Sequence, residues 1–539
     1  MSRHRFSVVA LTIALTGEVR VSVAATDTYP RQQGVDAIHY VFRLTVDDRS
    51  DRITGEAAVT VRLAAGVGEV TLDLTSATGE RGMTVSAVTL EGRSVPFGHA
   101  SDRLRITLDT TRASEERTLT VSYSGVPREG LRLINNIHGE RTMFSENWPN
   151  RARQWLPMID HPYDKATGEF IVSAPAHYQV VANGLLVEEA DLAGGMRRTH
   201  WKQSVPIASW LYAIGVARFA VHHYDVVRGI PQQVWVFPQD REQWKVFEST
   251  GRNAFEFFSD RIGPYAYEKL AHVQAAGIGG GTEHATAIFY GEKGVASGRA
   301  PVVHEVAHQW WGNAVTESDW DDVWLSEGFA TYFTHLHTEH VEGRDAFVRG
   351  LKRDIDTIIS AQKAVPDQPV IHRNLSDMSR VLNRLVYQKG GWVLHMLRGV
   401  MGTERFWAGI RDYYTRYRDR NASTDDFRQV MERAAGAPLS WFFDQWLKRP
   451  GMPALRGSWR YDTTARQVQI ELQQVQGGEP FRIPLEIAIR DAAGQSRVER
   501  VELAASTAQF AIAAAAEPGA VILDPNTWLL HQVVDFSKR

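Results

Sequence analysis

The chain has 539 residues, of which 43% are hydrophobic and 23% are charged, and its formal net charge is −3. This composition is typical of a folded protein of several domains, and the balanced charge argues against a nucleic-acid-binding role. The chain has no cysteine, which excludes disulfides, thiolate metal sites, cysteine nucleophiles and cysteine-linked lipid anchors. A bound transition metal would therefore need His, Asp or Glu ligands.

The N-terminal segment has the pattern of an export signal. Arg3 and Arg5 precede an apolar run over residues 6–17, and the small residues 23–25 suit a cleavage site. We therefore predict a signal peptide over residues 1–25 and a periplasmic or secreted protein. If this segment is not a signal, the protein is cytoplasmic. No segment contains about 18 uninterrupted apolar residues, so no membrane span is predicted in the mature chain.

The next part of the chain, residues 26–228, has the alternating pattern of β-strands. Apolar residues recur every second position in EAAVTVRL, residues 56–63, and in EVTLDL, residues 69–74. This period is that of strands with one buried face. Asn183 and Gly184 stand between two apolar runs and predict a hairpin turn. We expect a large antiparallel β-domain here.

The pattern changes to helical spacing over residues 229–450. Residues 241–263 place Trp244 and Phe255 on one apolar face, and the pattern of residues 423–436 opens on capping residues. Strand alternation then returns after residue 450, where Val468, Ile470 and Leu472 repeat by two. This last region predicts a small β-sandwich.

A metal-binding pattern lies in PVVHEVAHQWWGN, residues 301–313, where His304 and His308 stand four apart. On a helix these side chains share a face, with Cβ atoms about 5–6 Å apart, and both imidazoles can bind one zinc ion. Glu305 then reaches a metal-bound water rather than the metal. The alternative is a helix that has this pattern by chance.

A third ligand is expected, because a catalytic zinc site has three protein ligands and one open position. Glu327 in DVWLSEGFATYF stands nineteen residues beyond His308. Two helices packed side by side would bring Glu327 to both histidines. We therefore predict one Zn²⁺ per chain, bound by His304, His308 and Glu327. The alternative for Glu327 is a surface position on an amphipathic helix.

The segments HEVAHQWWGN and WLSEGFATYF resemble the paired signature of a family of zinc aminopeptidases, the gluzincins that include aminopeptidase N and leukotriene hydrolase. Ser326 stands where this family usually has Asn. The resemblance extends over residues 35–535. It implies a multidomain α+β fold with an N-terminal antiparallel β-domain, a thermolysin-like, mostly helical catalytic domain and a small C-terminal β-sandwich. The predicted divisions are a signal peptide and three domains, at residues 1–25, 26–228, 229–450 and 451–539.

Larger members of this family continue into a helical C-terminal domain. The present chain ends after its predicted sandwich. We therefore expect a short form with a more open cleft, or with a cleft that a partner subunit closes.

A glycine-rich segment, GIGGGTEHATAIFY, precedes the zinc motif at residues 277–290. Such a segment exposes its backbone and can pair with a peptide as an added strand, although taken alone it could be a glycine loop with a solvated Glu283. The resemblance implies that GGTEH, residues 280–284, corresponds to the family motif Gly-x-Met-Glu-Asn, and that Glu283 binds the substrate α-amine. Thr and His replace Met and Asn. The predicted substrate contacts here are Gly280, Gly281, Thr282 and Glu283.

Two further residues follow from the resemblance. YQKG, residues 387–390, resembles a Tyr-x-Lys-Gly segment of the family and implies that Tyr387 stabilises the oxyanion. The family often adds a second polar residue near the amine from its N-terminal domain. Trp148 occupies that position here, and Glu146 stands two residues before it. Glu146 is therefore predicted as a further substrate contact, with Trp148 as the alternative that shapes the first subsite.

Together these patterns predict a zinc metallo-aminopeptidase that acts on peptides with a free α-amine. Glu305 is the expected general base for a zinc-activated water. One alternative is a zinc endopeptidase or an epoxide hydrolase built on the same site. The other is a non-catalytic scaffold that binds peptides.

Overall fold

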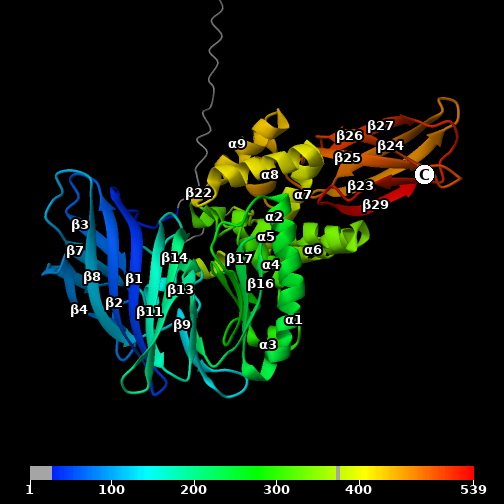
Figure 1. The fold of residues 1–539 in the computed structure, drawn as a ribbon. Coiled ribbons are helices and arrows are strands. Elements are labelled where there is room, and N and C mark those ends of the chain that lie inside the picture. The colour runs from blue at the N-terminus through cyan, green and yellow to red at the C-terminus, as the bar shows by residue number, and fades with distance from the viewer. Residues whose placement is uncertain (1–26, 372–376) are drawn as a thin grey trace, which may run out of the picture.

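The computed structural model describes residues 27–371 and 377–539, so the predicted signal peptide lies outside the described residues. Figure 1 shows three regions in chain order: a β-rich N-terminal region in blue and cyan, a mostly helical region in green and yellow, and a second β-region in orange and red. The predicted multidomain α+β fold is confirmed.

The largest sheet belongs to the N-terminal region. Its strands β1 and β11 pair in parallel, and all its other neighbours are antiparallel. The alternation predicted over residues 56–63 is observed, because the apolar side chains of this stretch are buried. In spatial order the strands are β13 (Leu185–Leu192), β14 (Met196–Ala208), β11 (Lys165–Pro175), β1 (Val35–Asp47), β2 (Ser50–Leu63), β8 (Glu115–Val126), β4 (Gly82–Leu90) and β5 (Arg93–Ser94).

Two smaller sheets complete this region. One consists, in spatial order, of β12 (Gln179–Ala182), β15 (Ile214–Ala217), β10 (Arg141–Ser145) and β9 (Leu131–Asn135). The other consists of β3 (Glu69–Asp73), β7 (Arg103–Thr107) and β6 (Phe97–Ala100). Strand β10 matters for function because the chain that follows it reaches the helical region.

The predicted hairpin at Asn183 and Gly184 is wrong. Strand β12 pairs with β15 and strand β13 pairs with β14, so this turn connects two different sheets. The Asn183 amide donates to the carbonyls of Leu211 at 2.8 Å and Ala285 at 2.6 Å. The Gly184 N–H donates to the Thr286 hydroxyl at 2.7 Å. Contacts with a distant part of the chain, rather than strand pairing, therefore stabilise the turn.

The helical region contains a five-stranded sheet. Because β16 pairs with β17, this sheet begins at Ala220, before the boundary predicted at residue 228. Strand β19 lies at one edge of the sheet and pairs antiparallel with β20. In spatial order the strands are β16 (Ala220–Val227), β17 (Ile230–Val236), β18 (Leu270–Ala275), β20 (Ala287–Gly291) and β19 (Gly281–Thr282).

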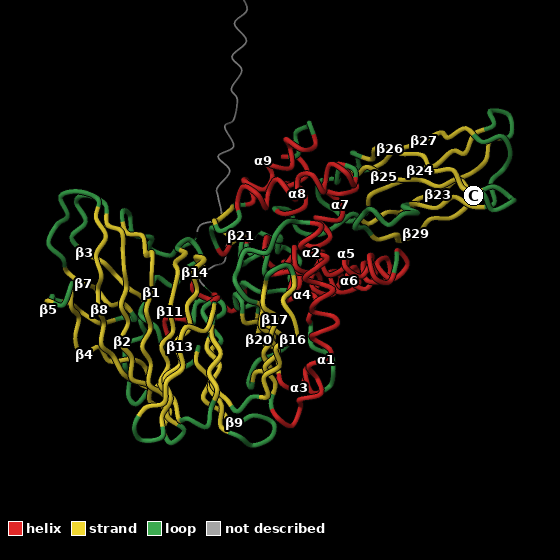
Figure 2. The backbone as a smooth tube through the Cα atoms, viewed as in Figure 1, coloured by secondary structure: helices red, strands yellow, loops and turns green. Residues whose placement is uncertain are grey.

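The helices group around this sheet and toward the C-terminal region, as Figure 2 shows in red. Helix α9 has the predicted N-terminal cap, in which the Ser423 side chain accepts from the Asp426 N–H and the Asp426 side chain accepts in return. The α-helices are α1 (Trp244–Val246), α2 (Arg252–Arg261), α3 (Glu292–Ala296), α4 (Val302–His308), α5 (Trp324–Glu342), α6 (Arg344–Ala364), α7 (Gly390–Met401), α8 (Thr403–Tyr417), α9 (Thr424–Ala435) and α10 (Ser440–Leu447).

Short turns and strands complete the chain, two of the turns in the N-terminal region and the others in the helical region. They are the 3₁₀ turns η1 (Ala152–Gln154), η2 (Ser209–Leu211), η3 (Pro238–Gln243), η5 (Trp320–Asp322) and η6 (Met378–Arg380), the π-helical turns η4 (Phe247–Gly251) and η7 (Leu385–Lys389), and the strands β21 (Val315–Glu317) and β22 (Arg420–Ala422).

Helices α5 and α7 touch through glycines. A Cβ added to Gly328 on α5 would lie 2.9 Å from the Gly390 carbonyl carbon on α7. This distance is closer than real Cβ contacts allow, so α5 needs glycine at the crossing, and a Cβ on Gly390 would be tight at 3.1 Å from Gly328 Cα. The close approach brings Tyr387, just before α7, beside Glu327 on the first turn of α5.

The C-terminal region forms two sheets, as the predicted sandwich requires. One is β27 (Thr507–Ala513), β24 (Gln467–Gln474), β23 (Ala454–Asp462) and β29 (Gln532–Lys538). The other is β26 (Ser496–Leu503), β25 (Ile483–Arg490) and β28 (Ala520–Leu523). Val468, Ile470 and Leu472 are buried as predicted. Among the described residues, no helix is both long and apolar enough to span a bilayer.

Candidate active site

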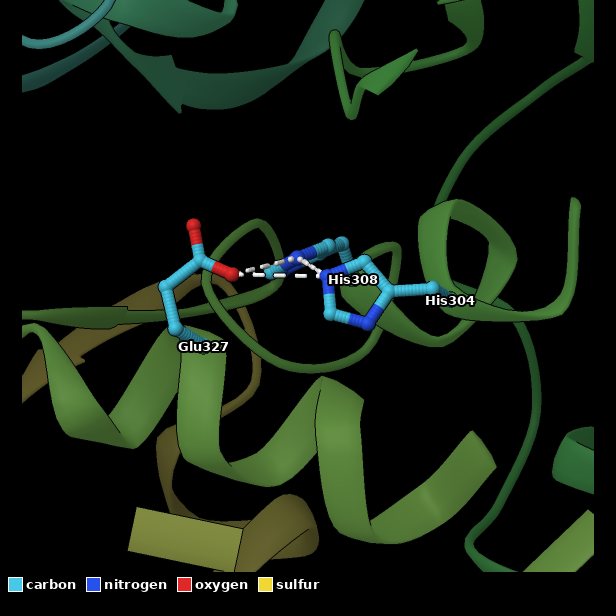
Figure 3. A group of neighbouring side chains, drawn as sticks. All are labelled: His304, His308 and Glu327. Carbon is cyan, nitrogen blue, oxygen red and sulfur yellow. Dashed lines mark hydrogen bonds and ion pairs between the residues drawn. The ribbon is translucent and has the colours of Figure 1, made fainter. Parts of the chain in front are cut away.

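Three side chains from two neighbouring helices meet at one point. His304 and His308 lie on α4 and Glu327 lies on α5, and Figure 3 shows the two imidazoles and the carboxylate pointing toward one another. The Nε2 atoms of His304 and His308 are 3.1 Å apart. Glu327 Oε2 lies 3.4 Å from His304 Nε2 and 3.3 Å from His308 Nε2.

This arrangement fits a zinc ion. Ligand atoms bonded at about 2.0–2.1 Å in a tetrahedral site are separated from one another by about 3.3 Å, which matches the three distances. Glu327 Oε2 is buried and accepts no hydrogen bond from the described residues, so it is available as a ligand. Two imidazoles and one carboxylate form a donor set that suits zinc.

The ring of His308 is oriented by the chain that follows it. Its Nδ1 donates to the Trp311 carbonyl at 3.1 Å and lies 3.2 Å from the Ser326 hydroxyl. A carbonyl oxygen only accepts, so the proton is on Nδ1 and the Nε2 lone pair faces His304 and Glu327. No sequence pattern indicates these two partners of His308. The only signal at either position is that Ser326 stands where the family usually has Asn.

Glu305 lies beside the triad and against the glycine-rich strand. It is buried, and burial raises the pKa of its carboxyl group well above the usual range. One carboxylate oxygen each of Glu305 and Glu283 and one ring nitrogen of His308 all lie within 4.8 Å of one another. A Cβ added to Gly281 on β19 would lie 2.4 Å from Glu305 Oε1. Gly281 therefore leaves the space that the Glu305 carboxylate occupies.

We expect the Gly281→Ala variant to lose about 10²-fold in kcat, because its methyl group would displace Glu305 and a small misplacement of a catalytic group is costly. Steady-state kinetics should be measured together with zinc content and thermal unfolding. Zinc content and folding should stay close to the parent protein. A kcat within about threefold of the parent would contradict this role of Gly281.

Glu283 is fixed at both its backbone and its side chain. Its carbonyl accepts from the Gln309 amide at 2.9 Å and from the Asn313 amide at 2.7 Å. Both amides belong to the segment that contains the histidines. The carboxylate oxygen Oε1 accepts from the Trp148 indole N–H. Glu283 is therefore held on one side by residues that directly follow α4, and on the other side by the N-terminal region.

Glu146 lies among arginines of the N-terminal region. The Glu146 carboxylate pairs with the guanidinium groups of Arg132 at 2.8 Å and Arg151 at 2.5 Å. Trp148, two residues later, contacts Glu283. Two arginines of its own domain thus neutralise the Glu146 carboxylate, and its role as a substrate contact stays a prediction.

Tyr387 reaches the metal ligands from η7. Its hydroxyl donates to Glu327 Oε1 at 2.8 Å, and its ring lies 6.1 Å from the His304 ring with an interplanar angle of 14°. Burial and the charge of Glu327 raise the pKa of Tyr387 well above the usual range. The hydroxyl is therefore a proton-bearing hydrogen-bond donor at the site.

The backbone beside the site is open at a sheet edge. Strand β19 pairs with β20 on one side, where Gly281 is opposite Tyr290 and Thr282 is opposite Phe289. The other side of β19 is the edge of the sheet within the described residues. Gly280 precedes the strand with a φ of +80°, which favours glycine. This edge can pair with an extended peptide.

Two histidines and a glutamate that converge on one point, with a second glutamate beside them, define the site of a mononuclear metallopeptidase. Residues 251–446 match the Peptidase family M1 domain, and residues 36–211 match the Peptidase M1 N-terminal domain. The chain therefore belongs to the M1 peptidase family. The two matches correspond to the helical region and the N-terminal β-region.

Similarity to two aminopeptidases supports this assignment. The chain is 28% identical over 335 residues to glutamyl aminopeptidase of Bos taurus, an alignment that covers 58% of this chain and 34% of the relative. It is 29% identical over 329 residues to aminopeptidase A of Gloydius brevicauda, with 58% and 34% covered. The aligned part is thus about a third of the length of these relatives.

A solved structure has a similar fold. It is a mutant of an M1 zinc metallopeptidase from Deinococcus radiodurans, with a TM-score of 0.68 and 24% identity. The match covers 78% of this chain and 96% of the other. This likeness supports the arrangement of the β-domain, the helical region and the C-terminal strands.

Proposed function

We propose that the protein is a zinc metallo-aminopeptidase that hydrolyses the N-terminal peptide bond of peptides with a free α-amine. The observation that carries this proposal is the position of Glu283, a buried carboxylate grouped within 4.8 Å with Glu305 and His308. A substrate ammonium bound by Glu283 would place the first peptide bond near the metal ligands. Aminopeptidase relatives agree with this reading.

The charge of the site favours a cationic substrate group. Glu283, Glu305 and Glu327 are all buried, and when all three are ionised around one divalent cation they leave one excess negative charge. Uncompensated charge is costly in a buried site. A free α-ammonium would compensate it, whereas a blocked amide terminus would not. This argument separates an aminopeptidase from an endopeptidase.

His304, His308 and Glu327 would hold the zinc. When bound, zinc acts as a Lewis acid that makes a water molecule acidic near neutral pH. Glu305 accepts a proton from the attacking water and passes it to the nitrogen of the leaving amine. Tyr387 donates its hydroxyl hydrogen bond to the carbonyl oxygen as negative charge develops there. Glu283 accepts from the α-ammonium, and β19 binds the peptide backbone, so the reacting bond is held in place.

We expect the Glu283→Ala variant to raise KM for free-amine substrates by about 10- to 150-fold, because a charge-assisted hydrogen bond contributes about 1.5–3 kcal/mol. A panel of aminoacyl chromogenic amides, each with free and acetylated amine, measures the effect. The parent enzyme should cleave the free-amine substrates only. Exposed Glu404 on α8 provides the matched control, since Glu404→Ala removes a surface glutamate that is not one of the site residues.

Two results would contradict the proposal. Cleavage of acetylated and free-amine substrates at similar rates would indicate an endopeptidase. An unchanged preference for the free amine in Glu283→Ala would remove Glu283 from amine binding.

A further inference from the structure

We propose that Trp148 is a positioning residue that holds the Glu283 carboxylate for the substrate amine, so that the N-terminal β-domain sets the strength of amine binding. This inference rests on the proposed aminopeptidase function. It starts from one contact: the Trp148 indole N–H donates to Glu283 Oε1. Both side chains are buried, with 6% and 4% of their surface exposed, so water competes little for this hydrogen bond.

The Trp148 ring has little freedom to move. It packs at 5.6 Å from Trp210 on η2 and at 4.9 Å from Trp320 on η5, and these two rings are 5.1 Å apart. Trp148 and Trp210 belong to the N-terminal region, whereas Trp320 follows the zinc motif. This tryptophan cluster therefore crosses the contact between the two regions. Such aromatic packing fixes the direction of the indole N–H.

The backbone before Trp148 is fixed as well. The buried Asn147 amide donates to the Tyr212 carbonyl at 2.7 Å. Its side-chain oxygen accepts from the Trp155 indole at 2.9 Å. Both ends of the Asn147 side chain are thus bonded inside the N-terminal domain. Trp148 is preorganised before any substrate binds, and it imposes one orientation on Glu283.

The chemistry of indole defines what this contact does. An indole N–H only donates, so this N–H cannot accept a hydrogen bond from an ammonium group. It occupies one Glu283 oxygen, and the carboxylate remains grouped with Glu305 and His308. Glu146, the other nearby candidate for a second anion, is paired with Arg132 and Arg151. The amine anchor therefore depends on the orientation of a single carboxylate, and Trp148 sets that orientation.

The Trp148→Phe variant keeps an aromatic ring and removes the N–H donor. We expect KM for free-amine aminoacyl amides to rise about fivefold to tenfold, with kcat within about twofold of the parent. The effect is smaller than that of Glu283→Ala, because the carboxylate that binds the amine remains and only the hydrogen bond that orients it is lost. The measurement is steady-state kinetics on the full chain loaded with zinc. Thermal unfolding of the same preparations checks that the variant is folded.

The same cluster offers a matched control. The Trp210 indole nitrogen is buried and has no hydrogen-bond partner among the described residues, so Trp210→Phe removes similar packing without removing a hydrogen bond. Because this variant keeps the Trp148 N–H and loses only part of the packing around it, KM should rise by less than in Trp148→Phe. Equal rises in KM for Trp148→Phe and Trp210→Phe would overturn the proposal, since packing alone would then account for the effect.

A double-mutant cycle tests that Trp148 acts through Glu283. In the Glu283→Ala background, Trp148→Phe should change KM by no more than about twofold, because the acceptor is already gone. A full rise in KM in that background would overturn the inference. If Glu283→Ala alone fails to weaken free-amine substrates, the proposed function fails. If Glu283→Ala weakens them and Trp148→Phe does not, only the role of Trp148 fails.

Discussion

Replacement of Glu305 by glutamine is expected to lower kcat by about 10³-fold while zinc stays bound, because general acid–base catalysis contributes about 10²- to 10⁴-fold. Glutamine has nearly the same shape and fits the space beside Gly281, but it cannot accept the proton. KM for free-amine substrates should change little, since Glu283 and β19 are intact. The measurement is single-turnover kinetics together with the zinc content of the same sample.

The zinc content separates two explanations for a loss of activity. If Glu305→Gln loses zinc as well as turnover, Glu305 contributes to metal binding and the distinction between base and ligand is wrong. If the variant keeps both zinc and more than about a tenth of the parent kcat, another group accepts the proton.

The second large effect is expected at Glu327. The Glu327→Ala variant should lose more than about 10²-fold in zinc affinity, because loss of partners behind the ligands alone costs about 10- to 100-fold and here a ligand itself is removed. Activity should fall to background. Titration with a zinc indicator measures the affinity. In the parent protein, a chelator should abolish activity and added Zn²⁺ should restore it.

Tyr387→Phe serves as the control for this experiment. It removes the hydroxyl that donates to Glu327 Oε1 but leaves all three ligands in place. Its zinc affinity should lie between those of the parent and Glu327→Ala. Unchanged zinc affinity in Glu327→Ala would contradict the assignment of Glu327 as a ligand.

The sequence predicts that His304, His308 and Glu327 converge, as the structure shows, and for a physical reason. The spacing of His304 and His308 is a property of one helix, and local periodicity determines it. Local periodicity does not determine the position of Glu327, because that position depends on the packing of α5 against α4. The fixed spacing of Glu327 after the histidines, and the resemblance to a known family, supplied that information. The glycine contact between α5 and α7 that brings Tyr387 close was not predicted.

Contacts between distant segments could not be predicted from local pattern. Asn183 and Gly184 have the composition of a hairpin turn, yet their partners lie at Leu211, Ala285 and Thr286. Likewise, the charge of Glu146 does not indicate that its carboxylate pairs with Arg132 and Arg151. Trp148 contacts Glu283 only because the tryptophan cluster joins two regions. In each case tertiary packing overrides a local preference.

The central claim is that His304, His308 and Glu327 bind one catalytic zinc ion. Anomalous diffraction at the zinc edge, on crystals of the zinc-loaded protein, tests it most directly. The account predicts a single strong peak per chain, about 2 Å from His304 Nε2, His308 Nε2 and a Glu327 carboxylate oxygen. A peak bound elsewhere, or a peak that contacts the histidines with Glu327 turned away, would contradict it.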